Sequence, residues 1–239
     1  MAHKVIIIGA TSGIGEALAK IYAAKGCKVG ISGRRQQLLD DLQKQYPDNI
    51  VTECFDVTGN ENTKYIDSLI QKLGGLDLLI YNSGYAQLFS SLRWEIEKQT
   101  TLVNVNGFVE SINFGLNYFL KQKKGQIAVT SSIASIRGNS LTPAYNASKA
   151  YVSSYMEGLS IKMYKQKLPI YLTDIQPGFV DTDMAQGNGT FWVAPVDKAA
   201  KQIYRAIKNK RRRVYITKRW WFIAQILKVI PYSIYKHIG

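Results

Sequence analysis

The chain has 239 residues, a length that suits one large α/β domain or two small ones. Hydrophobic residues make up 46% and charged residues 20%, which excludes a chain that is wholly disordered, collagenous or coiled coil. Two cysteines are too few for a disulfide framework, and His3 and His237 leave no material for a zinc site or a histidine-based catalytic triad.

The net charge is +14, and it is concentrated near the C-terminal end. Residues 198–239 hold 12 basic and no acidic residues, whereas residues 1–197 hold 19 basic and 17 acidic residues. The densest run is KNKRRR at 208–213. Such a run attracts nucleic acid or an anionic membrane, and the alternative is a solvated helix end whose cations suit the helix dipole.

No stretch approaches the roughly 20 apolar residues that a membrane-spanning helix needs. The apolar run at 5–8 is too short for the core of a signal peptide. We therefore expect a cytoplasmic protein, and we leave open a peripheral position at the inner face of a membrane.

Predicted strands and helices alternate along the chain. Short β-branched apolar runs predict strands at 4–8, 28–32, 50–55, 76–81, 126–131, 170–175 and 214–217. Apolar residues at helical spacing predict helices at 13–25, 35–45, 61–73, 95–121, 143–166 and 196–209, with Thr142 as the N-cap of the fifth. The alternation predicts an α/β fold, a single doubly wound (Rossmann-type) parallel sheet of about seven strands with helices on both faces.

We expect residues 1–217 to form the main domain and residues 218–239 a basic, aromatic helical appendage. Residues 220–230 predict a helix that ends at Pro231, apolar except for a stripe of Trp221, Gln225 and Lys228. Flanking cations with Trp and Tyr are typical of an anchor on an anionic membrane surface. The alternative is packing on the enzyme itself or on a partner subunit. Clustered aromatic residues do not suit a stacking groove, so we expect no nucleic-acid partner.

A glycine-rich loop, GATSGIG at 9–15, follows the first predicted strand and leads into a helix. Its glycines allow a tight turn, close approach to a pyrophosphate and close packing of the helix on the sheet. The helix N-terminus offers free N–H groups to phosphates. This strand–loop–helix context predicts a dinucleotide site.

The glycine spacing resembles that of the short-chain dehydrogenase/reductase family. Matching motifs follow in the family's order over about residues 4–217, although Ile8 replaces a usual threonine and Tyr81 a usual asparagine. The resemblance implies that the cofactor is contacted by Gly9, Thr11, Ser12, Gly13, Ile14, Gly15, Asp56, Val57, Asn82, Ser83, Gly84, Pro177, Gly178, Val180 and Thr182.

The end of the second strand indicates NADP(H). An acidic residue there would bind the ribose hydroxyls of NAD, whereas arginine accommodates the additional phosphate of NADP. Gly33 occupies the acidic position, and Arg34 and Arg35 follow directly and can pair with a phosphate.

Tyr145 and Lys149 lie four residues apart in a predicted helix and therefore share a face. A nearby ammonium would lower the pKa of the phenol from about 10 toward a useful range. The pair matches the family's catalytic Tyr-x-x-x-Lys, in which the lysine also binds the ribose of the cofactor. The family spacing selects Ser132 as the catalytic serine, with Ser131 and Ser135 as neighbouring alternatives.

The family's Val-Asn-x-x-Gly segment selects Asn104 as the fourth catalytic residue, with Asn106 as the alternative. In the implied mechanism the cofactor supplies a hydride, Ser132 polarises a carbonyl and Tyr145 protonates the alkoxide. Lys149 tunes Tyr145, and Asn104 organises a water that resupplies the proton. Reduction is favoured because cells keep NADPH reduced. The alternatives are a dehydrogenase of small hydroxy compounds and a non-catalytic NADP(H)-binding sensor or scaffold.

Between Gly178 and Val196, Gly187 and Gly189 are typical of a mobile loop over the substrate. Phe89, Phe191 and Trp192 suggest an apolar pocket wall and an apolar or lipid-like substrate. An ordinary packed loop is the alternative, so the identity of the small-molecule carbonyl or alcohol substrate stays open. The resemblance further implies a homodimer or homotetramer that pairs the long helices at 95–121 and 143–166.

Overall fold

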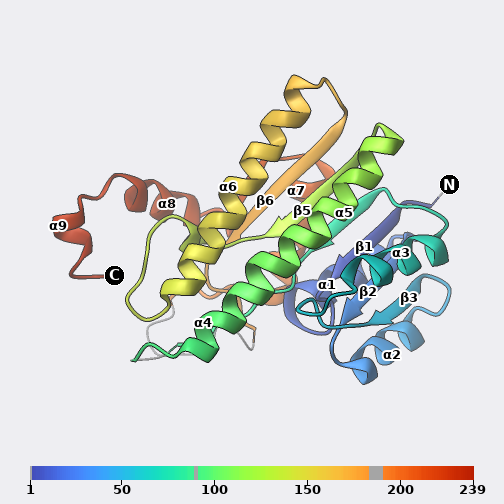
Figure 1. The fold of residues 1–239 in the computed structure, drawn as a ribbon, viewed down its shortest axis with the longest axis horizontal. Coiled ribbons are helices and arrows are strands. Elements are labelled where there is room, and N and C mark those ends of the chain that lie inside the picture. Colours follow the sequence, from blue (N-terminus) through green and yellow to red (C-terminus); the bar gives the residue numbers. More distant parts are fainter. Residues whose placement is uncertain (1, 89–90, 183–190) are drawn as a thin grey trace.

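The structure is a computed structural model and describes residues 2–88, 91–182 and 191–239. Seven parallel strands form one sheet in the order β3-β2-β1-β4-β5-β6-β7 (Figure 1). The strands are β1 (Lys4–Ile8), β2 (Lys28–Gly33), β3 (Ile50–Cys54), β4 (Leu78–Tyr81), β5 (Gly125–Thr130), β6 (Ile170–Pro177) and β7 (Arg213–Ile216). The strand order reverses between β1 and β4, and ligands of open parallel sheets bind beyond the carboxyl ends of the strands at such a reversal.

Helices cover both faces of the sheet, as the alternating sequence predicts. One face packs on α1 (Gly13–Ala24), α2 (Gln36–Gln45) and α7 (Val196–Lys208), and the other on α3 (Asn62–Leu73), α5 (Gly107–Gln122) and α6 (Pro143–Lys165). β1 shows why two cores form, because successive side chains of a strand point to opposite faces. Val5 and Ile7 join the first core and Ile6 and Ile8 the second, all completely buried.

The long helix predicted at 95–121 is divided in the structure. It begins as α4 (Trp94–Thr101), passes through a π-helical turn at Leu102–Asn106 and continues as α5. The π turn holds Asn104, whose buried side chain bonds outside the helix, and such turns are frequent at functional sites. Hydrophobic spacing does not distinguish a π turn from an α-helix, so the sequence could not locate it.

Most other element boundaries agree with the prediction to within one or two residues. α3 ends where Gly74 adopts a left-handed φ of +68°, and α6 begins with Pro143. Thr142 is the N-cap residue of α6, but its hydroxyl donates to Asn146 Oδ1 at 2.8 Å and does not cap the backbone.

Two C-terminal helices, α8 (Trp220–Val229) and α9 (Tyr232–Tyr235), extend beyond the sheet on the side away from β3 (Figure 1). Trp220 is buried on the body of the protein, whereas Phe222, Ile226 and Val229 are 64%, 55% and 78% exposed. The outer face of α8 is therefore apolar. Within the described residues, no helix is long and apolar enough to cross a membrane.

Candidate active site

The glycine loop lies at the carboxyl end of β1, beside the reversal of strand order. Gly9 has a φ of +86°, and a Cβ on it would lie 2.6 Å from the backbone nitrogen of Ser83. Only glycine allows both this conformation and this approach. Asn82 donates from Nδ2 to the Gly9 carbonyl at 3.0 Å and accepts from Thr130 Oγ1 at 2.9 Å. The loops after β1 and β4 and the end of β5 are thus linked.

The first turn of α1 is open to an anion. Ser12 is the N-cap residue, but its side chain does not cap the helix. The loop after β6 approaches the same turn, because the Thr182 methyl group would lie 3.0 Å from a Cβ on Gly13. Free N–H groups at a helix N-terminus bind phosphate, so this geometry fits the predicted phosphate contacts.

The two arginines after β2 point to different partners. Arg35 Nη2 donates to Thr11 Oγ1 at 2.8 Å and to Ser12 Oγ at 2.7 Å, which places its guanidinium over the glycine loop. Arg34 Nη1 lies 3.6 Å from Asp56 Oδ2. A Cβ on Gly33 would lie 2.5 Å from the Thr11 methyl group. Position 33, where an acidic side chain would bind the ribose of NAD, therefore carries no charge and has no room for a side chain.

Ser132, Tyr145 and Lys149 come together at the end of β5. Ser132 lies close enough to Tyr145 for its hydroxyl to favour ionisation of the phenol and so lower its pKa, and Ser132 Oγ lies 3.5 Å from the carbonyl oxygen of Pro177. Lys149 is 5% exposed, donates from Nζ to Thr130 O at 2.9 Å and lies 5.7 Å from the Tyr145 ring centroid. Ser131 instead bonds to a buried carboxylate on β6, so Ser132 is the serine that faces this corner.

Burial dominates the titration of both groups on α6. It raises the pKa of the Tyr145 phenol, which the Ser132 hydroxyl opposes. It lowers the pKa of Lys149 to about 8, which the negative charge of Asp174 opposes. The expected lowering of the Tyr145 pKa by Lys149 is not seen here, because the ammonium is bound to Thr130 O and desolvation of the phenol outweighs other influences.

Asn104 and Asn106 face different surroundings. Asn104 Oδ1 accepts from the Tyr85 backbone N–H at 2.8 Å, and Nδ2 donates to Tyr85 O at 2.9 Å and to Ser148 Oγ at 3.0 Å. Ser148 precedes Lys149, so Asn104 supports the turn of α6 that carries Lys149. Asn106 lines a separate groove.

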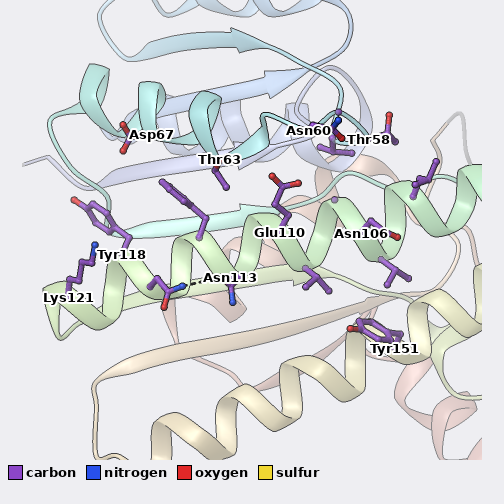
Figure 2. Close-up of a pocket in the computed structure, with 18 residues that line it drawn as sticks. Thr58, Asn60, Thr63, Asp67, Asn106, Glu110, Asn113, Tyr118, Lys121 and Tyr151 are labelled. Carbon is purple, nitrogen blue, oxygen red and sulfur yellow. Dashed lines mark hydrogen bonds between the residues drawn. The ribbon is translucent and has the colours of Figure 1, made fainter.

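That groove runs between α3 and α5 and has a volume of about 950 Å³. Figure 2 shows Thr63 on α3 opposite Glu110 on α5, with Tyr151 of α6 at one edge. Ser132, Tyr145 and Lys149 are not among its lining residues. The groove is therefore distinct from the catalytic corner.

An aromatic cluster adjoins the loop after β6. The Trp220 ring centroid lies 5.6 Å from that of Phe179 and 5.1 Å from that of Phe191. The cluster includes Trp192, whose carbonyl accepts a hydrogen bond from Arg219 Nη2 at 2.6 Å. Three predicted residues of the substrate region lie outside the described residues: Phe89, Gly187 and Gly189.

Sequence reasoning missed two contributors to this region. Trp220 was assigned to the appendage, although it packs against Gly178 of the predicted cofactor loop. Asp174, buried on β6, bonds to four side chains behind the catalytic corner. A carboxylate in the middle of the predicted strand at 170–175 was the available signal, because a buried charge requires partners.

The family profile described as short chain dehydrogenase matches residues 3–191, which is most of the chain. The chain belongs to this family. The short-chain dehydrogenases similar to it include 11-beta-hydroxysteroid dehydrogenase A of Sesamum indicum, 31% identical over 93% of this chain and 70% of that protein. An uncharacterised oxidoreductase of Mycobacterium tuberculosis is 30% identical over 95% of this chain and 92% of its own length.

Solved structures agree with the fold. ElxO with NADP bound has a TM-score of 0.79 at 22% identity and covers 90% of this chain and 97% of its own. A short-chain dehydrogenase/reductase from Burkholderia phymatum in complex with NAD has a TM-score of 0.85 at 18% identity, over 94% and 92% of the two chains. The same fold thus holds either dinucleotide, and this protein is an oxidoreductase of that family.

Proposed function

We propose that this protein is an NADP(H)-dependent oxidoreductase that reduces the carbonyl group of a ketone or aldehyde to an alcohol. The observation that carries the proposal is the corner at the end of β5, where Ser132, Tyr145 and Lys149 meet beside the glycine loop. Carbonyl reduction by hydride transfer needs a donor that polarises the carbonyl oxygen and an acid that protonates the product. Two hydroxyls next to a buried lysine supply these groups.

The residues around the glycine loop fit NADP(H). The uncapped first turn of α1 would bind the pyrophosphate, and the Arg35 guanidinium above Thr11 would pair with the additional phosphate. Arg34, whose side chain is exposed, would reach the same phosphate from the side of Asp56. Gly33 leaves no carboxylate to repel that phosphate or to bind the ribose hydroxyls of NAD.

Each residue of the corner has a defined task. NADPH, when bound, supplies the hydride. Ser132 donates to the carbonyl oxygen, and Tyr145 protonates the alkoxide. Lys149 holds the ribose and returns a proton to Tyr145. The Asn104 side chain is already occupied by Tyr85 and Ser148, so Asn104 acts by fixing the π turn, whose backbone would hold the water that resupplies the proton.

An apolar substrate suits the surroundings. Phe179, Phe191 and Trp192 lie beside the Pro177–Gly178 loop, and Phe191 and Trp192 are 48% and 45% exposed. The similar protein of Sesamum indicum is named for a hydroxysteroid, which is an apolar ring compound. We propose a ketone or aldehyde attached to an apolar chain or ring system.

Titration with NADPH and with NADH, followed by nicotinamide fluorescence, tests the cofactor. We expect at least about tenfold tighter binding of NADPH, the minimum that a charge-assisted contact to the phosphate would give. A panel of apolar ketones and aldehydes then tests turnover by the loss of NADPH absorbance. Equal affinity for the two cofactors would contradict the NADP(H) assignment, and binding of neither would contradict the enzyme assignment.

We also propose that α5 and α6 pair with a second copy of the chain. α6 exposes Tyr151, Ile161 and Tyr164 at 43%, 51% and 85%, and large exposed apolar side chains favour association. The expected mass in solution, by light scattering, is that of a dimer or tetramer. A monomer at micromolar concentration would exclude this assembly.

The C-terminal helices support a peripheral contact with an anionic membrane. α8 exposes Phe222 and Ile226, and the surrounding segment carries Lys218, Lys228 and Lys236 without any acidic residue. We expect the protein to float with vesicles that contain phosphatidylglycerol and the double variant Phe222→Glu/Ile226→Glu to stay in the soluble fraction. The matched control is Leu38→Glu, an exposed apolar position on α2. Wild-type protein that never floats would remove the membrane from the proposal.

A further inference from the structure

A buried carboxylate lies behind the catalytic corner and is not used by the proposed reaction. Asp174 on β6 is 3% exposed. Its Oδ2 accepts from Ser153 Oγ at 2.9 Å, from Gln176 Nε2 at 2.8 Å and from Arg213 Nε at 3.1 Å, and its Oδ1 accepts from Ser131 Oγ. These partners belong to β6 itself, α6, β7 and the segment directly after β5. One carboxylate therefore joins four parts of the fold.

Two of these partners adjoin the residues assigned to catalysis. Ser131 directly precedes Ser132, so the hydrogen bond to Asp174 turns Ser131 away from the corner and fixes the backbone that carries Ser132. Ser153 lies four residues after Lys149 on α6, and residues at this spacing share a helix face. Asp174 thus holds both segments from which the corner is built.

Lys149 needs a nearby negative charge. It is buried, and among the described residues it forms no salt bridge, so that its ammonium is bound only by the Thr130 carbonyl. Asp174 lies near this ammonium, because Lys149 Nζ bonds to Thr130 O and the next residue, Ser131, bonds to Asp174. The Tyr145 ring lies on the same helix as Lys149, and Arg213 bonds to Asp174 from β7. Desolvation favours neutral lysine, and Asp174 is the acidic group whose charge opposes it.

Arg213 neutralises the Asp174 carboxylate and also contacts an acidic residue at the surface. Its guanidinium bonds to Asp174 and lies 3.7 Å from Glu157 Oε2, and Glu157 also accepts from Arg212 Nη1 at 3.2 Å. Two arginines of the dense basic run are therefore paired within the protein. Charges alternate from Lys149 through Asp174 and Arg213 to Glu157.

We propose that Asp174 is a positioning residue of the active site, which fixes Ser131 and Ser153 and places a negative charge near the buried Lys149, with Arg213 limiting the strength of its field. The proposal rests on the proposed function only for the catalytic importance of Lys149. The charge relation itself is a property of the folded chain and is measurable without a substrate.

The test is an NMR titration of the protein with ¹³C-labelled lysine, in which the Lys149 signal is assigned from the Lys149→Arg variant. We expect the Lys149 midpoint, near pH 8 in the wild type, to fall by about one pH unit in Asp174→Asn, because an attractive charge has been removed. In Arg213→Gln the midpoint should rise, because the carboxylate is no longer neutralised. The matched control is Glu157→Gln, a half-exposed acid whose charge is screened by water, and its midpoint should stay near that of the wild type.

Opposite shifts in Asp174→Asn and Arg213→Gln separate a charge effect from a general loosening of the fold, which would move both midpoints in one direction. If Asp174→Asn does not fold, the sign of the shift in Arg213→Gln decides. An unchanged Lys149 midpoint in the folded variants would overturn the proposal. Loss of the proposed function is detected separately, as failure of the wild type to bind NADPH.

Discussion

The glycine loop and the corner formed by Ser132, Tyr145 and Lys149 lie at the same edge of the sheet, but they differ in where their cations lie. The cations beside the glycine loop are exposed, and the cation of the corner is buried. At the glycine loop the cations are on the surface: Arg34 is 62% exposed, and the side chain of Arg35 bonds, among the described residues, only to the hydroxyls of Thr11 and Ser12. At the catalytic corner Lys149 and Asp174 are 5% and 3% exposed. An exposed cation stays hydrated, so it costs the fold little free energy and can bind an anionic ligand. A buried cation loses its hydration and needs a compensating charge within the fold.

The difference teaches where mutations should act. A change at Arg34 or Arg35 should affect cofactor binding and leave the stability of the free protein almost unaltered. A change at the corner should affect turnover and stability together, because the groups proposed for catalysis are also buried. The following predictions test that contrast, beginning with the largest expected effect.

Tyr145→Phe removes the proposed acid and keeps the ring. We expect kcat to fall by about 10²- to 10⁴-fold, the range for loss of a general acid, while NADPH affinity stays within a few-fold of the wild type. Turnover on a ketone from the panel and fluorescence titration of NADPH measure the two quantities. The exposed Tyr164→Phe is the control. Full turnover by Tyr145→Phe would contradict the assignment of the acid.

Arg35→Ala should weaken NADPH binding by about 10- to 100-fold, because a charge-assisted hydrogen bond to the phosphate contributes about 1.5–3 kcal/mol. NADH, which lacks that phosphate, should bind with unchanged affinity. Lys44→Ala removes an exposed cation from α2 and serves as the control. A parallel loss of NADPH and NADH affinity would show that Arg35 shapes the loop and does not read the phosphate.

The same contrast explains what the sequence could predict. The fold, the glycine loop and the Tyr145/Lys149 pair depend on contiguous or helical spacing, which one sequence displays directly. The roles of Asp174 and Trp220 depend on contacts between residues distant in the chain, such as Ser131 with Asp174 and Gly178 with Trp220. The π turn at Asn104 depends on bonds to Tyr85, which hydrophobic periodicity does not report.

Lys149→Met should stabilise the protein at neutral pH. Burial lowers the Lys149 pKa from 10.5 to about 8, so the unfolded chain binds the proton more tightly than the folded protein. The resulting cost to the wild type is complete below pH 8 and disappears as the pH rises toward 10.5. The advantage of Lys149→Met in the free energy of unfolding should therefore fall by about 2 kcal/mol between pH 6.5 and 9.5.

Urea unfolding of wild type and Lys149→Met across this pH range measures that difference. Lys162→Met, at an exposed lysine on the same helix, should show no comparable change with pH. If the difference in the free energy of unfolding between Lys149→Met and wild type does not change with pH, Lys149 is not buried as a cation. That result would contradict the contrast between exposed cations at the glycine loop and a buried cation at the corner.

The two regions meet at the loop after β6, where the smallest effect is expected. A Cβ on Gly178 would lie 2.0 Å from Cε2 of the buried Trp220, so Gly178→Ala should destabilise the protein by about 1–3 kcal/mol through overpacking. In a Trp220→Leu background the added methyl group has room, and the two changes should couple by at least about 0.5 kcal/mol.

Gly158→Ala, where a Cβ meets nothing within 4 Å, is the control. Urea unfolding of the single and double variants gives the coupling free energy. Additive changes would show that α8 does not support the predicted cofactor loop, and residues 218–239 would then act as an appendage separate from the active site.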